Sequence, residues 1–140
     1  MASPEIVNWI QSTPEPSVKP SEKDYLEPSA VAELIRRSPK DIAIIDLRKN
    51  DFVGGKIKGA FNIPAQSIYH SVDDLYDLFD KAEKKEIIVH CVSSRDRATR
   101  TWGWLTDYKN SKGSGPEIFI LKGGFNAFKA ADGTNDLIDN

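Results

Sequence analysis

Cysteine is nearly absent from this sequence, whose 140 residues include one cysteine, Cys91, and two histidines. A single cysteine cannot form an internal disulfide, and no cluster of Cys and His has the spacing of a zinc site. We therefore expect a reducing compartment, the cytoplasm or the nucleus. The same composition predicts no bound metal and no resident cofactor.

Long apolar runs and an excess of charge of one sign are also missing. No apolar run approaches the roughly 20 residues of a membrane-spanning helix. The N-terminal sequence lacks the basic start and apolar middle of a secretory signal. The net charge of -2 argues against a nucleic-acid binder that relies on bulk positive charge. Membranes and nucleic acids are therefore not expected as partners, and the oligomeric state has no signature in the sequence.

The residues that are present, 39% hydrophobic and 29% charged, are typical of a single globular domain. Four prolines fall within the first 20 residues, at positions 4, 14, 16 and 20. They predict an extended or disordered N-terminal extension over 1–20 and a folded domain over 21–140. The extension contains an apolar group that could dock on the domain, formed by Ile6, Val7, Trp9 and Ile10.

Apolar strand-like segments alternate with helix-like segments along the rest of the chain. The main strands are predicted over 41–48, 86–91 and 116–121, with shorter ones near Tyr25 and within 54–64. Helices are predicted over 28–39, 71–85 and 97–109, and the segment 122–131 is predicted as a glycine turn that leads into a terminal helix. This alternation predicts an α/β fold with a central parallel sheet covered by helices on both faces. Ligands bind at the carboxyl ends of strands in such folds, and Cys91 lies at one such end.

The helix predicted over 71–85 has two specific features. Its core face is expected from the helical spacing of four residues, Leu75, Leu78, Phe79 and Ala82. Ser71 and Asp74 have the spacing of a capping box, with Asp in place of the usual Glu or Gln.

A Cys-x5-Arg segment joins a predicted strand to a predicted helix. Its residues are Cys91, Val92, Ser93, Ser94, Arg95, Asp96 and Arg97. Backbone N–H groups in such a loop can bind an oxyanion, and Arg97 can hold two of its oxygens. The two serines are small, and their hydroxyls can stabilise a thiolate or a leaving group. A cysteine thiolate here would attack phosphorus, arsenic or sulfane sulfur and form a covalent intermediate.

The nucleophilic and charged residues of this segment also have structural interpretations. Cys91 alone could be a small buried hydrophobe, but its spacing to Arg97 favours a nucleophile. Asp96 could be the general acid that protonates the leaving oxygen. Alternatively, Asp96 could point to solvent and offset the charge of Arg95 and Arg100. These two arginines could steer an anionic substrate or simply be solvated.

Further residues are expected to support the site structurally. Asp46 and Arg48, at the end of a strand, are interpreted as a buried pair that fixes the strand ends. His90 precedes the cysteine, so its ring should point away from the anion and hold the loop by hydrogen bonding. Asp51 and Phe52 are interpreted as anchors of the turn that follows Arg48.

Three stretches of the sequence carry a resemblance to a known family. The stretch IIDLRKNDFVGGKIKGAFNIP (44–64) has Asp-x-Arg at a strand end, followed by Gly-x-Ile-x-Gly-Ala-x-Asn-Ile-Pro. The stretch IIVHC (87–91) leads to the cysteine, and IFILKGGFNAF (118–128) has a closing strand with a Gly-Gly-Phe turn. Together they resemble the rhodanese-like domain, in the expected order, over about 25–129.

The His-Cys-x5-Arg form of the loop narrows this resemblance. Sulfurtransferases of the family generally use a shorter loop that fits a single sulfur atom. M-phase inducer phosphatases and the related eukaryotic arsenate reductases use His-Cys-x5-Arg, which fits a tetrahedral oxyanion. His90, Cys91 and Arg97 match this second sort, and the resemblance is to its small stand-alone fungal-type members.

Other positions of the loop match the phosphatase pattern less closely. Ser93, Ser94 and Asp96 correspond to its two serines and its acid, but the serines lie one place nearer the cysteine. The usual Gly-Pro after the arginine is Ala98-Thr99 here. Replacing Gly-Pro by Ala-Thr could change the geometry of the loop, but it does not affect the assignment of Cys91 as the nucleophile.

The resemblance implies a cysteine-dependent, dual-specificity protein phosphatase that acts through a phosphocysteine. Arsenate reduction is the alternative, and it needs external glutathione or glutaredoxin because the sequence offers no second cysteine. Sulfur transfer from thiosulfate is disfavoured by the loop length, and a catalytically silent binding module is disfavoured by the intact Cys91 and Arg97. The expected partner is a phosphoprotein or a small oxyanion substrate.

Overall fold

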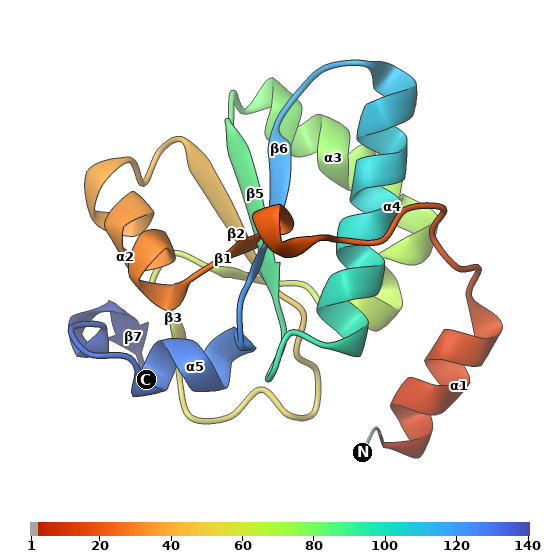
Figure 1. Ribbon diagram of the computed structural model, residues 1–140. Coiled ribbons are helices and arrows are strands. Elements are labelled where there is room, and N and C mark those ends of the chain that lie inside the picture. Colours follow the sequence, from red (N-terminus) through yellow and green to blue (C-terminus); the bar gives the residue numbers. More distant parts are fainter. Residues whose placement is uncertain (1–2) are drawn as a thin grey trace.

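The computed structural model describes residues 3–140 (Figure 1). Its centre is a five-stranded sheet with the order β1-β6-β5-β2-β4, in which all neighbouring strands are parallel. The strands are β1 (Tyr25–Leu26), β2 (Ile42–Asp46), β4 (Phe61–Asn62), β5 (Glu86–His90) and β6 (Glu117–Leu121). The predicted α/β fold with a central parallel sheet is therefore confirmed.

Helices cover both faces of this sheet, as the sequence predicts (Figure 1). One face is covered by α2 (Pro28–Arg37) and α5 (Gly124–Ala130), and the other by α3 (Val72–Lys81) and α4 (Asp96–Lys112). Successive strand side chains point to opposite faces. Ile45 and Val89 therefore enter the core beneath α3 and α4, whereas Ile44 and Ile88 enter the core beneath α2 and α5. Sheets buried on both faces need continuous apolar strands, which explains the absence of polar alternation.

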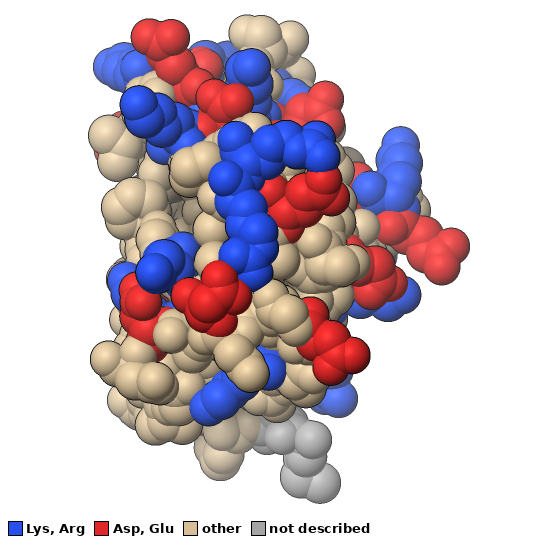
Figure 2. All heavy atoms as spheres, turned by 90° about the vertical axis from the view of Figure 1, so that its left-hand side faces the viewer, with Lys and Arg blue, Asp and Glu red and all other residues tan. Residues whose placement is uncertain are grey.

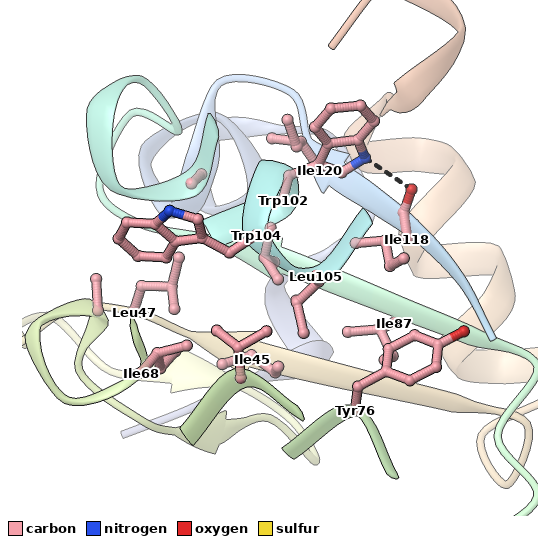
Figure 3. Close-up of a cluster of buried hydrophobic side chains, with 14 of the residues drawn as sticks. Ile45, Leu47, Ile68, Tyr76, Ile87, Trp102, Trp104, Leu105, Ile118 and Ile120 are labelled. Atoms are coloured by element: carbon pink, nitrogen blue, oxygen red, sulfur yellow. Dashed lines mark hydrogen bonds between the residues drawn. The ribbon is translucent and has the colours of Figure 1, made fainter. Parts of the chain in front are cut away.

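The larger core lies between the sheet and the helices α3 and α4 (Figure 3). Two buried aromatic rings there have their polar atoms satisfied. Trp102 Nε1 donates to the carbonyl of Ile118 at 2.9 Å, and the Tyr76 hydroxyl donates to the carbonyl of Pro116 at 2.7 Å. Because these contacts hold α4 against the sheet, the end of the loop that leads into α4 is also held in place.

Helix α3 agrees with its prediction only in part, since Phe79 is buried and Leu75 packs against the core, whereas Ala82 is exposed. Leu78 is 60% exposed, because the buried stripe consists of Val72, Tyr76 and Phe79. Tyr76 is buried because its hydroxyl finds a backbone acceptor across the core, a pairing that the sequence pattern does not contain. Ser71 provides no side-chain cap, since its backbone is not extended and the short helix before it runs directly into α3.

The N-terminal extension also differs from its prediction. Helix α1 (Pro4–Ser12) occupies much of 1–20, the part expected to be extended or disordered, and residues 1–2 lie outside the described residues. Ser3 caps the helix through Ile6 N, and Pro4 occupies the first turn, where a missing N–H costs nothing. Trp9 is buried, and its ring meets that of Trp104 edge to face at 5.6 Å. The prolines therefore mark a helix start and an extended strap rather than disorder.

The strap, residues 13–20, crosses helix α4 (Figure 1). The backbone N–H of Ser17 donates to the Asp107 carboxylate at 2.8 Å. Gly103 of α4 makes room for this crossing, because a Cβ there would lie 2.5 Å from a carbon of Pro16. The same glycine that lowers the helix propensity of α4 thus allows close packing of the strap.

The remaining elements are short. A separate antiparallel pair consists of β3 (Lys56–Ile57) and β7 (Ile138–Asp139). Short 3-10 helices are η1 (Glu22–Asp24), η2 (Ala65–Ser67), η3 (Tyr69–Ser71) and η4 (Asn135–Leu137).

The outer surface carries both signs of charge. On the α2 side of the molecule, basic and acidic side chains are interspersed (Figure 2). Arg36 of α2, for example, pairs with Asp136 at 2.7 Å. Across residues 3–140, no helix combines the length and the apolar character needed to span a bilayer.

Candidate active site

The anion loop, residues 91–97, connects the central strand β5 to helix α4. Cys91 is 3% exposed and follows the last residue of β5 directly. The backbone N–H of Phe125 donates to the Cys91 carbonyl at 2.9 Å, and that of Asn126 donates to the Val92 carbonyl at 3.1 Å. The start of α5 therefore holds the first two carbonyls of the loop from one side.

Gly124 makes this support possible. Its φ is +66°, and a Cβ at this position would lie 2.4 Å from the Val92 carbonyl oxygen and 2.5 Å from that of Cys91. Only glycine combines this backbone conformation with such a close approach. The Gly-Gly-Phe turn of the sequence thus supports the anion loop by packing against it.

A cavity of about 330 Å³ opens above the anion loop. Its lining includes most of the predicted loop residues, namely Cys91, Ser93, Arg95, Asp96 and Arg97. Asp51, from the loop after β2, and Ser3 and Ile6, from the N-terminal segment, complete the lining. The structure therefore brings together residues that are far apart in the sequence around the thiol of Cys91.

Two predicted loop residues do not line this cavity. Val92 contributes its backbone to the contact with α5. Ser94 is 5% exposed and has a left-handed backbone with φ +57°. Its hydroxyl has no hydrogen-bond partner among the described residues. Ser94 therefore shapes the turn of the loop, and Ser93 is the serine that lines the cavity.

Arg97 forms a bidentate ion pair with Asp51. Its two terminal nitrogens lie 3.0 and 2.5 Å from the two carboxylate oxygens of Asp51. The hydrogen bonds from Arg97 lower the pKa of Asp51, against the opposing effect of partial burial. Burial lowers the pKa of Arg97, but the hydrogen bond to Asp51 and the charges of Cys91 and Asp51 outweigh it and raise that pKa. Both partners are therefore charged at neutral pH.

Asp51 is the site residue that sequence reasoning missed. The sequence predicts only that Asp51 anchors its turn, and it also has this role, because the backbone N–H of Lys49 donates to its Oδ1 at 3.0 Å. Arg97 and Asp51 are 46 positions apart, so no local spacing connects them. The only signal was the position of Asp51 just after a strand whose carboxyl end adjoins that of β5.

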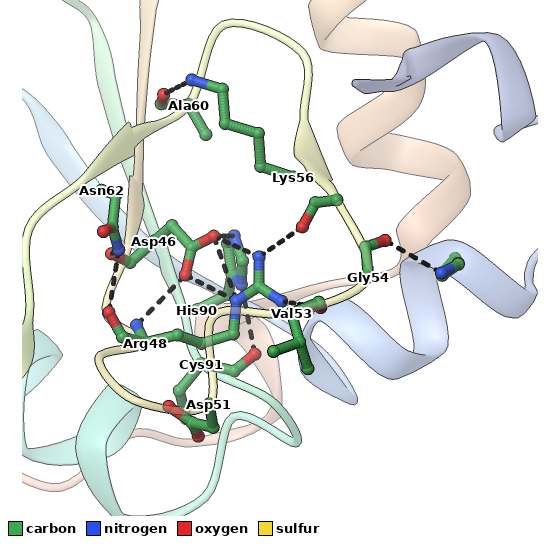
Figure 4. Close-up of polar contacts among 12 residues, drawn as sticks. Asp46, Arg48, Asp51, Val53, Gly54, Lys56, Ala60, Asn62, His90 and Cys91 are labelled. Atoms are coloured by element: carbon green, nitrogen blue, oxygen red, sulfur yellow. Dashed lines mark hydrogen bonds and ion pairs between the residues drawn. The ribbon is translucent and has the colours of Figure 1, made fainter. Parts of the chain in front are cut away.

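Asp46 and Arg48 form a buried pair beside the anion loop (Figure 4). The Arg48 guanidinium donates to both carboxylate oxygens of Asp46, at 2.7 to 3.2 Å, and to the carbonyls of Val53 and Gly55. Its carbon lies 4.0 Å from the centre of the Phe125 ring. Neither side chain lines the cavity. The pair therefore connects the loop after β2 to α5 and does not take part in anion binding directly.

The ring of His90 is completely buried and lies away from the cavity. Its Nδ1 is 3.2 Å from the Cys91 carbonyl oxygen, and its ring stacks on Phe125. Burial lowers the pKa of His90 more than the nearby Asp46 raises it. The imidazole is therefore neutral at pH 7 and supports the start of the loop.

The two further arginines near the loop lie in different environments. Arg95 is exposed at the cavity rim. Arg100 is buried, contrary to both sequence interpretations, because the strap covers it. Its guanidinium donates to the Thr13 carbonyl at 2.9 Å and to the Glu15 carboxylate at 2.7 Å. It lies 5.7 Å from the Trp9 ring and 5.6 Å from the Trp104 ring. Arg100 therefore holds the N-terminal segment to α4.

Ala98 and Thr99, which replace the family's Gly-Pro, are compatible with the first turn of α4. Ala98 is fully buried in the core. The Thr99 hydroxyl donates to the carbonyl of Arg95 at 2.6 Å, so it closes the turn through a side-chain bond. The departure from the family pattern leaves the loop and helix continuous.

A parallel sheet whose central strand is followed directly by a cysteine, with an arginine six residues further on at the start of a helix, is the arrangement that this structure shows. The chain belongs to the rhodanese-like domain family, since the family model described as Rhodanese-like domain matches residues 27–131. The family resemblance of the sequence is therefore confirmed.

Known relatives include proteins of two activities. The dual specificity phosphatase ibp1 of Schizosaccharomyces pombe is 30% identical over 122 residues, which cover 75% of this chain and 87% of that protein. Arsenical-resistance protein 2 of Saccharomyces cerevisiae is 28% identical over 104 residues, which cover 69% of this chain and 80% of that protein. The solved structure of an As-Sb reductase from Leishmania major superposes with a TM-score of 0.74 at 27% identity, covering 81% of this chain and 83% of that one.

Proposed function

We propose that this protein is a cysteine-dependent phosphatase of dual specificity that acts on phosphotyrosine and on phosphoserine or phosphothreonine. The observation that carries the proposal is the cavity in which the thiol of Cys91 and the guanidinium of Arg97 face the same space. The similarity to a dual specificity phosphatase over most of both chains supports it. Phosphoprotein is therefore the proposed substrate class, and the cytoplasm or nucleus the proposed location.

The reaction proposed for Cys91 has two steps. The thiolate attacks phosphorus, the bond from phosphorus to the substrate oxygen breaks, and that oxygen leaves with a proton. Water then attacks the phosphocysteine, the sulfur–phosphorus bond breaks, and inorganic phosphate leaves. In both steps the N–H groups of the loop and Arg97 would hold the equatorial oxygens, where negative charge develops.

Asp96 is the proposed proton donor to the leaving oxygen. It is the first residue of α4, lines the cavity, and forms no side-chain hydrogen bond or ion pair with the residues described. A carboxyl group that is free of partners can turn toward a bound substrate. Asp51, the other carboxylate of the cavity, is already committed to Arg97.

Arsenate reduction is a second candidate, supported by the similarity to Arsenical-resistance protein 2 and to the As-Sb reductase structure. Cys91 would attack arsenate and release hydroxide as water. A thiol of glutathione would then attack the sulfur of the adduct, so that arsenic(V) leaves as arsenite and a mixed disulfide remains. Glutaredoxin with further glutathione would reduce this disulfide, since Cys91 is the only cysteine in the sequence.

A parallel assay of the purified protein tests these proposals. The substrates are para-nitrophenyl phosphate with phosphopeptides, arsenate with glutathione and glutaredoxin, and thiosulfate with cyanide. We expect phosphate release, and we expect Cys91→Ser to abolish it while circular dichroism and melting temperature stay close to those of the native protein. Arsenite alone would assign the second candidate, thiocyanate alone would assign sulfur transfer, and no product in any assay would favour a silent binding module.

A further inference from the structure

The cavity contains a carboxylate that the reaction does not use. Asp51 lines the cavity together with Cys91, and both of its oxygens accept hydrogen bonds from Arg97. A carboxylate beside an oxyanion site repels the anion, so its presence there needs an explanation. Either Asp51 competes with the substrate for Arg97, or it holds Arg97 in the orientation that the substrate needs.

The geometry of the pair distinguishes these two roles. Asp51 contacts the two terminal nitrogens of Arg97, and each of these nitrogens carries two hydrogens. A guanidinium has five N–H groups, so this end-on contact leaves three of them, including the one on Nε, for acceptors other than Asp51. The side of the guanidinium formed by Nε and one terminal nitrogen can therefore bind two oxygens of a tetrahedral anion while Asp51 stays bound.

Asp51 is itself held in place, as a residue that orients another must be. The backbone N–H of Lys49 donates to its Oδ1 at 3.0 Å. The Lys49 ammonium pairs with Glu5 of α1 at 2.8 Å. The preceding Arg48 is fixed in the buried pair with Asp46. The loop that carries Asp51 is thus supported from the sheet and from the N-terminal helix.

The partners also differ in exposure. The Arg97 side chain is 11% exposed and that of Asp51 is 41% exposed. Solvent at Asp51 weakens its repulsion of a bound anion, whereas the nearly enclosed guanidinium depends on its few partners for orientation. Fixing a flexible arginine before the anion arrives reduces the entropy lost on binding.

We propose that Asp51 is a positioning residue, which holds Arg97 end-on so that the other edge of its guanidinium faces the anion above Cys91. This inference rests on the proposed function only in assuming that residues 91–97 bind an oxyanion. It applies equally to phosphate and to arsenate, because both are tetrahedral oxyanions.

The test is direct binding of tungstate, an unreactive tetrahedral dianion, measured by calorimetry on the full chain without turnover. We expect Asp51→Asn to weaken binding by about tenfold, the low end for a charge-assisted hydrogen bond. Asp132→Asn, a matched change at an exposed residue without side-chain partners in the described structure, should leave binding unchanged. Equal or tighter binding by Asp51→Asn would overturn the proposal and make Asp51 a competitor.

A double-mutant cycle separates positioning from a general effect on the fold. Arg97→Lys cannot form the planar bidentate contact, so adding Asp51→Asn to it should change tungstate affinity by less than about twofold. An undiminished tenfold effect in that background would show that Asp51 acts without Arg97 and would overturn the proposal. Because the readout is binding, absence of phosphatase activity would refute the proposed function and leave this test intact.

Discussion

At the scale of single residues, the role proposed for Asp96 is to protonate the leaving oxygen. General acid catalysis typically contributes about 10²–10⁴-fold and is most important when the leaving oxygen is basic. We expect Asp96→Asn to reduce kcat for phosphotyrosine or an alkyl phosphate by at least about 10²-fold, and to reduce kcat for an activated aryl phosphate far less. Steady-state kinetics with both substrates measures this difference.

Equal and small effects on the two substrates would contradict the role of Asp96 as the acid. Asp51→Asn is the informative comparison, because it changes the other carboxylate of the same cavity. A positioning residue should affect both substrates to a similar degree, since both require the orientation of Arg97. For each variant, kcat on the substrate with the basic leaving group can be divided by kcat on the activated aryl phosphate. This ratio distinguishes the role of Asp96 from that of Asp51 more clearly than either kcat alone.

The local part of the site could be predicted, and its distant part could not. Cys91, Asp96 and Arg97 lie within seven consecutive positions, so a strand, a loop and a helix start are enough to bring them to one cavity. Asp51 reaches Arg97 only because β2 and β5 are adjacent parallel strands. A sequence pattern predicts that both strands belong to the sheet, but the exact reach of a side chain from a loop depends on packing.

At the scale of elements, the contact between α5 and the anion loop depends on Gly124. An alanine there would combine left-handed backbone strain, about 1–2 kcal/mol, with an overlap against the carbonyls of Cys91 and Val92. We expect Gly124→Ala to lower the free energy of unfolding by more than about 2 kcal/mol and to weaken tungstate binding, because the loop must shift. Denaturant unfolding and calorimetry measure the two effects.

Gly133 provides a matched control for this change. It has a similar φ of +78°, and nothing lies within 4 Å of the Cβ that an alanine would add. Gly133→Ala should therefore show the backbone strain alone, with unchanged anion binding. If the two variants lose the same stability and bind tungstate equally well, the close approach of α5 has no role in shaping the loop.

The N-terminal elements show why residues 4–12 form a helix where the sequence predicts an extended or disordered segment. The number of prolines describes composition only, whereas the local structure of the segment depends on where each proline lies. Pro4 begins α1, and Pro16 rests on Gly103 of α4. The N-terminal segment is held on the domain by tertiary contacts of Trp9 and Arg100. These contacts join α1 and the strap to α4, the helix that carries Arg97. Such contacts have no signature in a window of neighbouring residues.

At the scale of the whole molecule, the buried His90 makes stability depend on pH. Burial lowers the pKa of its imidazole in the folded state, while the unfolded chain has an ordinary value of about 6.5. Below that pH the unfolded state binds a proton that the folded state does not, so the free energy of unfolding falls as pH falls. The slope appears as the pH falls below about 6.5, and for one proton it has an upper limit of about 1.4 kcal/mol per pH unit.

Denaturant unfolding between pH 5 and 8 measures this dependence. His90→Phe removes the titrating group and retains a ring against Phe125, so its stability should be nearly flat over that range. The comparison uses slopes, because the substitution also changes packing. An identical slope in both proteins would assign the pH dependence to other groups and would mean that the buried imidazole accepts a proton in the folded state.

The contribution of Ser3 and Ile6 to the cavity lining has a practical consequence for recombinant work. An affinity tag fused ahead of these residues would begin near the rim of the cavity, where a polyhistidine or an acidic linker adds its own charge to the surroundings of Cys91 and Arg97. A tag after Asn140 extends from β7, whose residues do not line that opening. We therefore expect measured tungstate affinity to depend on an N-terminal tag more than on a C-terminal one.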